Sequence, residues 1–92
     1  MADQRLSHPQ RRILAYLAAE DRRTRGTMSA DHQALARALV AQGHDKSNVS
    51  TSLYNLAAKG LVRITRTPGG KAEAVDLTPA GRHEVVNKAI IP

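Results

Sequence analysis

The sequence predicts a mainly α-helical domain with one small β-hairpin, in the order α-α-α-β-β-α. Two observations predict this class. Before residue 60, apolar residues recur every three or four positions, which is the spacing of helices that bury one face. After Gly60, apolar and polar residues alternate as in strands, and the run 67–70, Thr-Pro-Gly-Gly, separates two such stretches. Proline fixes φ and glycine permits positive φ, so this run is expected to form a tight turn.

The composition limits both the core and the kinds of site that the chain can carry. The 92 residues show no repeat, linker or low-complexity tract, so we expect a single domain over residues 1–92. Phe and Trp are absent, and the core must therefore be aliphatic. The absence of Cys excludes disulfides, thiolate catalysis and Cys-ligated metals. The formal charge of +6, from 14 Lys and Arg against 8 Asp and Glu, favours a polyanionic partner, although a merely soluble basic protein would have the same balance.

The first helix is expected to begin after Ser7. Ser7 can cap it, Pro9 lies in its first turn, and Gln10 stands three residues after the serine, as in a capping box. Its apolar stripe places its end near Glu20 or Asp21. The members of that stripe are Ile13, Leu14, Leu17 and Ala18. The polar residues 1–6 are expected to be frayed.

A second and a third helix follow, joined by a short turn that contains Gly43. Ser29 is expected to cap the second helix, and Asp45 or Ser47 the third, which spans 46–58. The second helix is expected to bury Leu35, Ala36, Leu39 and Val40, and the third Val49, Leu53 and Leu56. Two helices joined through a tight glycine-containing turn form a helix-turn-helix.

The hairpin and a last helix complete the order. Two strands alone are only marginally stable, so one face of the hairpin must pack on the helices. The residues available for that face are Val62, Ile64, Val75 and Leu77. Thr78 and Pro79 suit the cap and first position of the last helix. The tail, residues 83–92, is expected to cover the first helix or to contact a second copy of the chain. Its aliphatic residues are Val85, Val86, Ala89, Ile90 and Ile91.

The third helix carries short donors and acceptors on its polar face instead of the Glu and Lys typical of a solvated helix. Serine and threonine have low helix propensity, so their cluster lowers the intrinsic stability of the helix. The candidate residues on this face are Lys46, Ser47, Asn48, Ser50, Thr51, Tyr54 and Asn55, and the candidate cations of the hairpin are Arg63, Arg66 and Lys71. A polar helix beside a basic hairpin suits the major groove of double-stranded DNA. A solvated helix face and a solvated hairpin are the alternative interpretations.

These elements resemble the winged helix-turn-helix superfamily, and within it MarR-type transcriptional regulators. The resemblance covers roughly residues 29–82 and rests on three runs, which are 49–53, Val-Ser-Thr-Ser-Leu, 56–62, Leu-Ala-Ala-Lys-Gly-Leu-Val, and 77–82, Leu-Thr-Pro-Ala-Gly-Arg. It implies that the third helix enters the major groove and that the hairpin is a wing on the backbone or minor groove. It also implies that Ser50 and Thr51 contact bases or phosphates, and that Arg66 and Lys71 flank the wing tip.

The sequence departs from that family in two respects. The wing tip lacks the Asp-x-Arg signature that is usual there. The long helices that bracket the family's domain and form its dimer and effector pocket are also missing from the sequence. We therefore expect no small-molecule effector.

No pattern typical of catalysis or of cofactor binding is present. The histidines lack the spacing of a metal-ligand pair, no Gly-rich phosphate loop precedes a helix, and the carboxylates form no acid/base couple. The histidines are His8, His32, His44 and His83. No apolar stretch is long enough for a membrane span or a signal core. We expect no enzyme, no metal, no cofactor and no membrane partner, and a cytoplasmic location with nucleoid association when DNA is bound.

The pattern as a whole favours a sequence-specific double-stranded DNA-binding protein that regulates transcription. Helix 46–58 would lie in the major groove and wing 63–74 on the backbone or in the minor groove. This helix can cover little more than one half-site, so we expect a homodimer on an inverted repeat. The alternatives are a winged-helix module for protein interaction or nucleoprotein assembly, in replication, partition or DNA architecture, and a duplex RNA binder.

Overall fold

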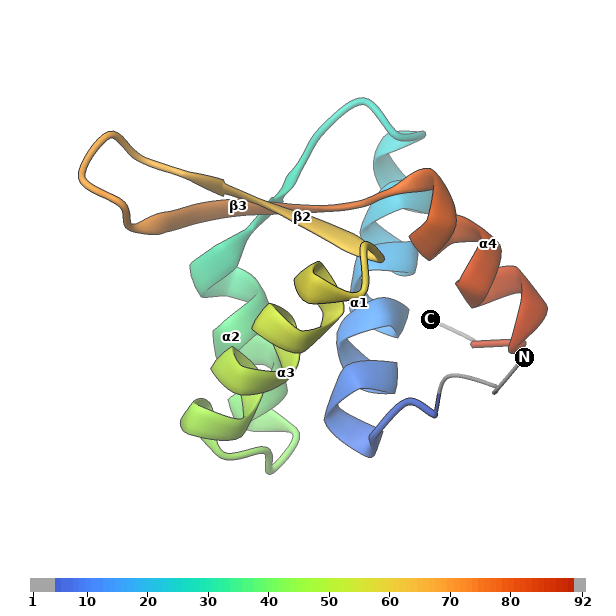
Figure 1. The fold of residues 1–92 in the computed structure, drawn as a ribbon, viewed down its shortest axis with the longest axis horizontal. Helices are drawn as coiled ribbons and strands as arrows, with labels where there is room; N and C mark the ends of the chain where they lie inside the picture. Colours follow the sequence, from blue (N-terminus) through green and yellow to red (C-terminus); the bar gives the residue numbers. More distant parts are fainter. Residues whose placement is uncertain (1–4, 91–92) are drawn as a thin grey trace.

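The computed structural model describes residues 5–90 and places in them four helices and one three-stranded antiparallel sheet (Figure 1). The elements are α1 (His8–Thr24), β1 (Ala30–Asp31), α2 (His32–Ala41), α3 (Lys46–Ala58), β2 (Val62–Arg66), β3 (Ala72–Leu77) and α4 (Pro79–Asn87). The β2–β3 hairpin projects past α2 and α3 as a wing, and α4 lies near the opposite end beside α1 (Figure 1). The predicted mainly α fold with a small β-wing is confirmed, and β1 is added to the predicted order.

Helix α1 begins as the sequence predicts. The Ser7 hydroxyl accepts from the Gln10 N–H at 3.3 Å, and the Gln10 side chain accepts from the Ser7 N–H at 2.9 Å, which completes the capping box. The helix continues to Thr24, beyond the end expected at Glu20 or Asp21. Its last turn is polar and solvated, so the apolar stripe did not mark it. Residues 1–4 of the segment expected to be frayed lie outside the described residues.

The expected cap of the second helix was wrong by two residues. Ser29 is not the N-cap. Asp31 is, and its carboxylate accepts from the Ala34 N–H at 2.9 Å. Ala30 and Asp31 are extended because they pair with β3 opposite Val75 and Ala74, which makes the strand order β1-β3-β2. The partner residues are more than 40 positions away in the sequence, so no local sequence pattern predicts this strand.

The core is aliphatic, as the composition requires. Its fully buried side chains are Ile13, Leu14, Leu35, Leu39, Leu53, Leu56 and Val75. The wing packs on them through Val62, Val75 and Leu77, with Ile64 partly buried, so the predicted inner face of the hairpin is confirmed. The expectation that Val40 is buried was wrong. It is 46% exposed, because Leu35 and Leu39 already occupy the side of α2 that faces the core.

The C-terminal segment covers α1 only in part. Val85 is partly buried and Ile90 is buried in the core, as expected for a cover on the first helix. Val86 is 80% exposed on the outer side of α4. Ile91 lies outside the described residues.

A glycine lets α4 approach the start of β2. Thr78 caps α4 through its hydroxyl, which accepts from the Gly81 N–H at 3.0 Å and donates to the Gly60 carbonyl at 2.6 Å. The Thr78 N–H donates to the Leu61 carbonyl at 3.1 Å. Gly81 is buried, and a methyl group on it would overlap that same carbonyl oxygen. Only glycine therefore fits at this position.

An ion pair joins α4 to α1. The Arg82 guanidinium donates to both carboxylate oxygens of Asp21, at 3.1 and 3.0 Å, and so connects α4 with α1. These hydrogen bonds hold the pKa of Asp21 below its ordinary value. Asp21 therefore stabilises the fold when it is ionised.

We predict that Gly81→Ala destabilises the fold, because the added methyl group forces α4 away from the Leu61 carbonyl. The expected loss in free energy of unfolding is about 1–3 kcal/mol, the usual cost of overpacking. Urea denaturation measures it. Gly69→Ala at the wing tip is the matched control, since its added methyl group meets nothing closer than 3.9 Å and Gly69 has no positive φ. Equal stability of the two variants would contradict the close approach.

We predict that Asp21→Asn lowers the free energy of unfolding at pH 7 by at most about 1 kcal/mol, since the pair is partly exposed. The pKa of Asp21 is lower in the folded than in the unfolded chain, so its contribution is present above the ordinary carboxyl pKa and is lost as the pH falls through the folded-state pKa. Urea denaturation at pH 7, 5 and 3 should show the variant and the wild type converging at low pH. Glu73→Gln, an exposed carboxylate on β3, is the control. A pH-independent difference would speak against the ion pair.

Candidate nucleic-acid interface

The exposed side of α3 is set by its buried side. Val49, Leu53 and Leu56 face the core, and Asp45 caps the helix by accepting from the N–H groups of Ser47 and Asn48 at 3.0 and 3.3 Å. The opposite side carries exposed polar side chains that make no hydrogen bond to any residue between 5 and 90. They are Ser47, Asn48, Thr51 and Asn55. Their donors and acceptors are therefore available to a partner.

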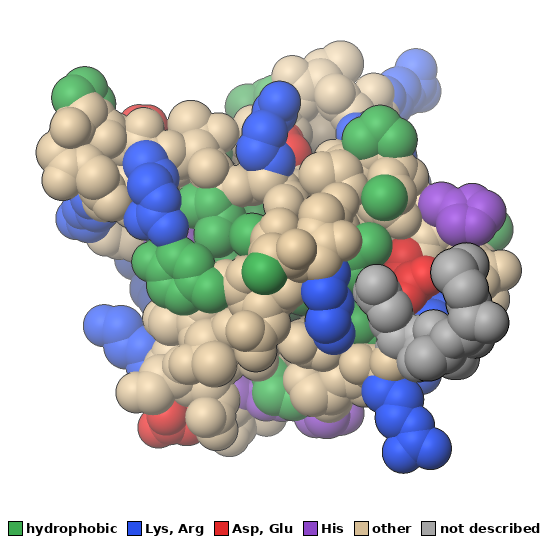
Figure 2. Space-filling view, viewed as in Figure 1, with side chains coloured by type: hydrophobic (Ala, Val, Ile, Leu, Met, Phe, Trp, Pro, Cys, Tyr) green, Lys and Arg blue, Asp and Glu red, His purple; other side chains and the backbone are tan. Residues whose placement is uncertain are grey.

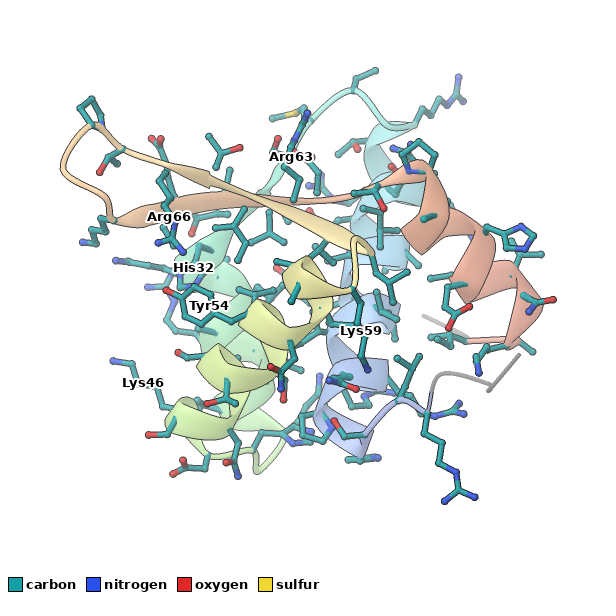
Figure 3. The ribbon with its side chains drawn as sticks, viewed as in Figure 1. His32, Lys46, Tyr54, Lys59, Arg63 and Arg66 are labelled. Atoms are coloured by element: carbon teal, nitrogen blue, oxygen red, sulfur yellow. The ribbon has the colours of Figure 1, made fainter. Side chains whose placement is uncertain are left out.

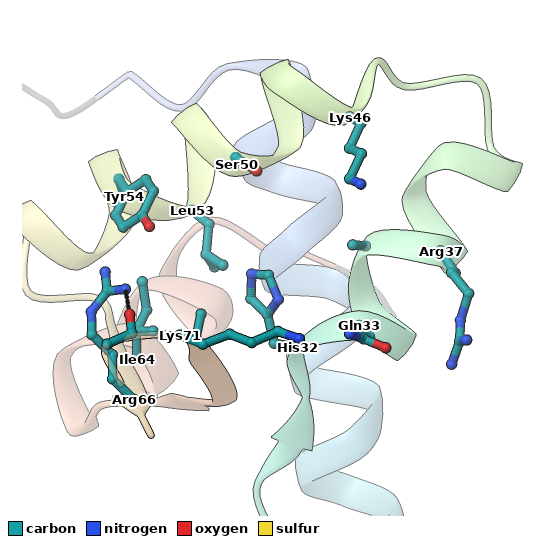
Figure 4. Close-up of a pocket in the computed structure, with 13 residues that line it drawn as sticks. His32, Gln33, Arg37, Lys46, Ser50, Leu53, Tyr54, Ile64, Arg66 and Lys71 are labelled. Carbon is teal, nitrogen blue, oxygen red and sulfur yellow. Dashed lines mark hydrogen bonds between the residues drawn. The ribbon is translucent and has the colours of Figure 1, made fainter. Parts of the chain in front are cut away.

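A groove separates this helix from the wing. It has a volume of about 570 Å³ and lies between α2, α3 and the β2–β3 hairpin (Figure 4). Its apolar lining comes from Ala36, Leu53, Ile64 and Ala72. Its polar lining comes from His32, Gln33, Arg37, Lys46, Ser50, Tyr54, Arg66 and Lys71. Among the described residues that line the groove there is no Asp or Glu, so its local charge is positive.

The four Lys and Arg side chains of the groove have no carboxylate partner within the described part of the chain. The ion pairs found there are Arg23–Glu20, Arg63–Asp76, Arg82–Asp21 and Lys88–Glu84. None of these pairs involves a groove residue. In Figure 2 the surface over α3 is largely uncharged, with Lys and Arg side chains at its edges. An anion could thus approach the groove cations without competition from an internal acid.

Arg66 is held in place at the edge of the groove. Its guanidinium carbon lies 5.2 Å from the centroid of the Tyr54 ring, and its Nη1 donates to the Gly70 carbonyl at 3.1 Å. Tyr54 is 51% exposed, so its ring is a surface on which the guanidinium stacks and not a part of the core. Figure 3 shows Arg66 directed toward Tyr54 and α3.

Arg63 is not brought together with the other candidate residues. It projects from the opposite face of the sheet (Figure 3), where it pairs with Asp76 at 3.4 Å. The Ser29 hydroxyl donates to the same carboxylate at 2.8 Å. The reason is the alternation of strand β2, because Val62 and Ile64 face inward and Arg63 must face outward. Arg63 therefore does not share a face with Arg66 and Lys71, the other two predicted wing cations.

Sequence reasoning missed the contribution of α2. His32, Gln33 and Arg37 line the groove from that helix (Figure 4). In a helix-turn-helix the first helix crosses the phosphate backbone, so the polar side of residues 32–41 was the available signal. The nine candidate residues other than Arg63 lie on α3 or at the wing side of the groove.

Residues 5–90 contain no group of three or more His, Asp or Glu side chains that could hold a metal ion. No helix among them is both long and apolar enough to cross a membrane.

Comparisons with known proteins identify the fold. No protein-family model and no curated protein sequence matches the chain. Among solved structures, a MarR-family transcriptional regulator from Silicibacter pomeroyi is similar, with a TM-score of 0.65 and 29% identity over 89% of this chain and 49% of that one.

Two further matches concern DNA directly. A point mutant of S. aureus MepR bound to an oligodeoxyribonucleotide has a TM-score of 0.62 and 20% identity, over 90% of this chain and 59% of that one. Bordetella bronchiseptica BpsR, whose DNA binding is regulated by 6-hydroxynicotinic acid, has a TM-score of 0.66 and 24% identity, over 97% and 63%. The chain spans about half the length of the first solved structures that it matches. The chain therefore has the winged-helix fold of MarR-type transcriptional regulators.

Proposed function

We propose that this protein is a sequence-specific double-stranded DNA-binding regulator of transcription, with α3 in the major groove. The observation that carries the proposal is that the polar surface of α3 is continuous with the cationic groove beside the wing. The exposed donors and acceptors of α3 adjoin a groove that is lined by four Lys and Arg side chains and no acid. A helix fits the major groove, where each base pair presents its own pattern of donors and acceptors.

The two surfaces would have different roles. Arg37, Lys46, Arg66 and Lys71 would bind phosphates, which supply affinity without reading sequence. The neutral side chains of α3 would contact base edges. They are Ser47, Asn48, Ser50, Thr51 and Asn55. The MepR mutant bound to an oligodeoxyribonucleotide supports DNA as the partner. Arg63 has no place in this proposal, because it lies on the other face.

Two copies of the chain would bind one operator. Helix α3 has 13 residues and is about 20 Å long, so it reaches only one half-site. A pair on an inverted repeat would supply the rest of the specificity. The expectation that no small-molecule effector acts finds no support in the comparisons, since the DNA binding of BpsR is regulated by one. A cytoplasmic, nucleoid-associated location would follow from the DNA-binding role.

The surface of α3 favours nucleic acid over a protein partner. Among the described residues the large exposed hydrophobics are Met28, Val40, Tyr54 and Val86, and of these only Tyr54 is on α3. Tyr54 is covered in part by the Arg66 guanidinium. A helix that docked on another protein would present a larger apolar patch.

Selection of bound fragments from random duplex DNA tests the proposal. We expect a recovered motif with two inverted half-sites, about one helical turn apart. Duplex RNA and single-stranded DNA should compete poorly with the selected duplex. Equal competition by duplex RNA, or recovery of no motif, would overturn the proposal.

We predict that Lys46→Ala and Lys71→Ala each weaken binding by a similar factor on every duplex and reduce the slope of log K against log salt concentration by about one. Each change removes one phosphate contact and its released counterion. Fluorescence anisotropy over a salt series measures both quantities. Arg63→Ala is the matched control, because it removes a wing cation on the far face. If Arg63→Ala flattened the slope as much as Lys71→Ala does, the groove would not be the phosphate site.

We predict that Asn48→Ala and Thr51→Ala instead relax sequence preference, with a loss of about 1–3 kcal/mol on the selected site and little loss on random duplex. These side chains are exposed on α3 and lack partners among residues 5–90, so their removal costs only base contacts. Binding to the selected site and to single-base variants of it gives the measurement. An equal loss on all sequences would assign these residues to the backbone.

A further inference from the structure

The tip of the wing carries no side chain suited to reading a DNA groove. Its sequence, residues 67–70, is Thr-Pro-Gly-Gly, which has no cation and no amide. The Thr67 hydroxyl accepts from the Lys71 N–H at 3.2 Å, and the Gly70 N–H donates to the Thr67 carbonyl at 2.8 Å. The one polar side chain of the tip is thus turned back into the turn. Two cations of the wing, Arg66 and Lys71, flank this tip and line the groove.

A β-bulge keeps an acid out of the groove. Thr65 pairs with Ala74, but the next residue, Arg66, pairs with Ala72, so Glu73 is the extra residue on β3. Without the bulge, Glu73 would share the inner face with Val75 and Leu77, since side chains alternate along a strand. With it, Ala72 lines the groove and Glu73 is exposed elsewhere. Bulges commonly re-aim side chains in this way.

Arg66 is directed toward α3. Its guanidinium stacks on Tyr54 of α3 and gives one N–H to the Gly70 carbonyl, which leaves its other donors facing the groove. A planar guanidinium with free donors binds phosphate oxygens in pairs. The stack and the hydrogen bond therefore hold Arg66 ready for a phosphate between the wing and α3.

From this geometry, and resting on the proposed function, we propose that the wing clamps the phosphodiester backbone beside the major groove and does not read the minor groove. Tyr54 is the positioning residue, because its ring aims Arg66 into the groove. The backbone strand would run between α3, which carries Lys46, and the wing, which carries Arg66 and Lys71. Arg37 of α2 lines the same groove. Sequence preference would then arise from α3 alone.

Base analogues in the selected duplex test this inference. Inosine in place of guanine removes the minor-groove amino group, and 2-aminoadenine in place of adenine adds one, while the major-groove pattern stays the same. Placed throughout the flanks of each half-site, these analogues should change Kd by less than twofold. A change of tenfold or more would overturn the inference and leave the proposed function standing. A wild-type chain that binds no duplex would overturn both.

The role of Tyr54 is tested by two variants of the same side chain. Tyr54→Phe keeps the ring and should bind like the wild type, whereas Tyr54→Leu should lose as much affinity as Arg66→Ala and reduce the salt slope by about one. In an Arg66→Ala background, Tyr54→Leu should have no further effect. Circular dichroism controls for folding. Loss of binding in Tyr54→Phe would make the hydroxyl the contact, and an unchanged slope in Tyr54→Leu would remove Tyr54 as the positioning residue.

Discussion

The rotation of α3 about its own axis is the constraint on which the rest of the surface depends. Val49, Leu53 and Leu56 fit into an aliphatic core that contains no Phe or Trp, and their spacing of four and three residues permits only one orientation of the helix. A rotation by one residue, about 100°, would bury Ser50 or Asn48 and expose a leucine. Core packing therefore decides which polar side chains a partner meets. Ser52 illustrates the point, because it belongs to the same polar run and is buried.

The distribution of ion pairs matters more for binding than the net charge of +6. On the outer faces, Arg63, Arg82 and Arg23 each have a carboxylate partner. These pairs are partly exposed and contribute little to stability, but they neutralise the cations locally. In the groove, Arg37, Lys46 and Lys71 have no such partner among residues 5–90. Screening limits the electrostatic field of a surface charge to a range of about 8 Å at physiological salt. The positive field is therefore strongest at the groove, where no carboxylate among residues 5–90 lines the surface beside the cations.

The wing is shaped by pairings between residues that are distant in sequence. β1 is held only by β3, and it places Asp31 at the N-terminus of α2 so that the helix begins beside the wing. The bulge at Thr65 and Arg66 removes Glu73 from the inner face. The alternation of side chains along β2 could have predicted from the sequence that Arg63 and Arg66 lie on opposite faces. The displacement of Glu73 from the inner face could not be predicted, because a bulge depends on the pairing with the partner strand.

The sequence by itself determined the features that local chemistry controls. The caps at Ser7 and Thr78, the bounds of α3 and the inner face of the hairpin follow from hydrogen bonds and periodicities that span a few residues. Only the tertiary structure decided that β1 exists, that α2 lines the groove, and that Arg66 stacks on Tyr54. These features are contacts between elements, and their geometry depends on how the whole aliphatic core packs, which no short stretch of sequence encodes.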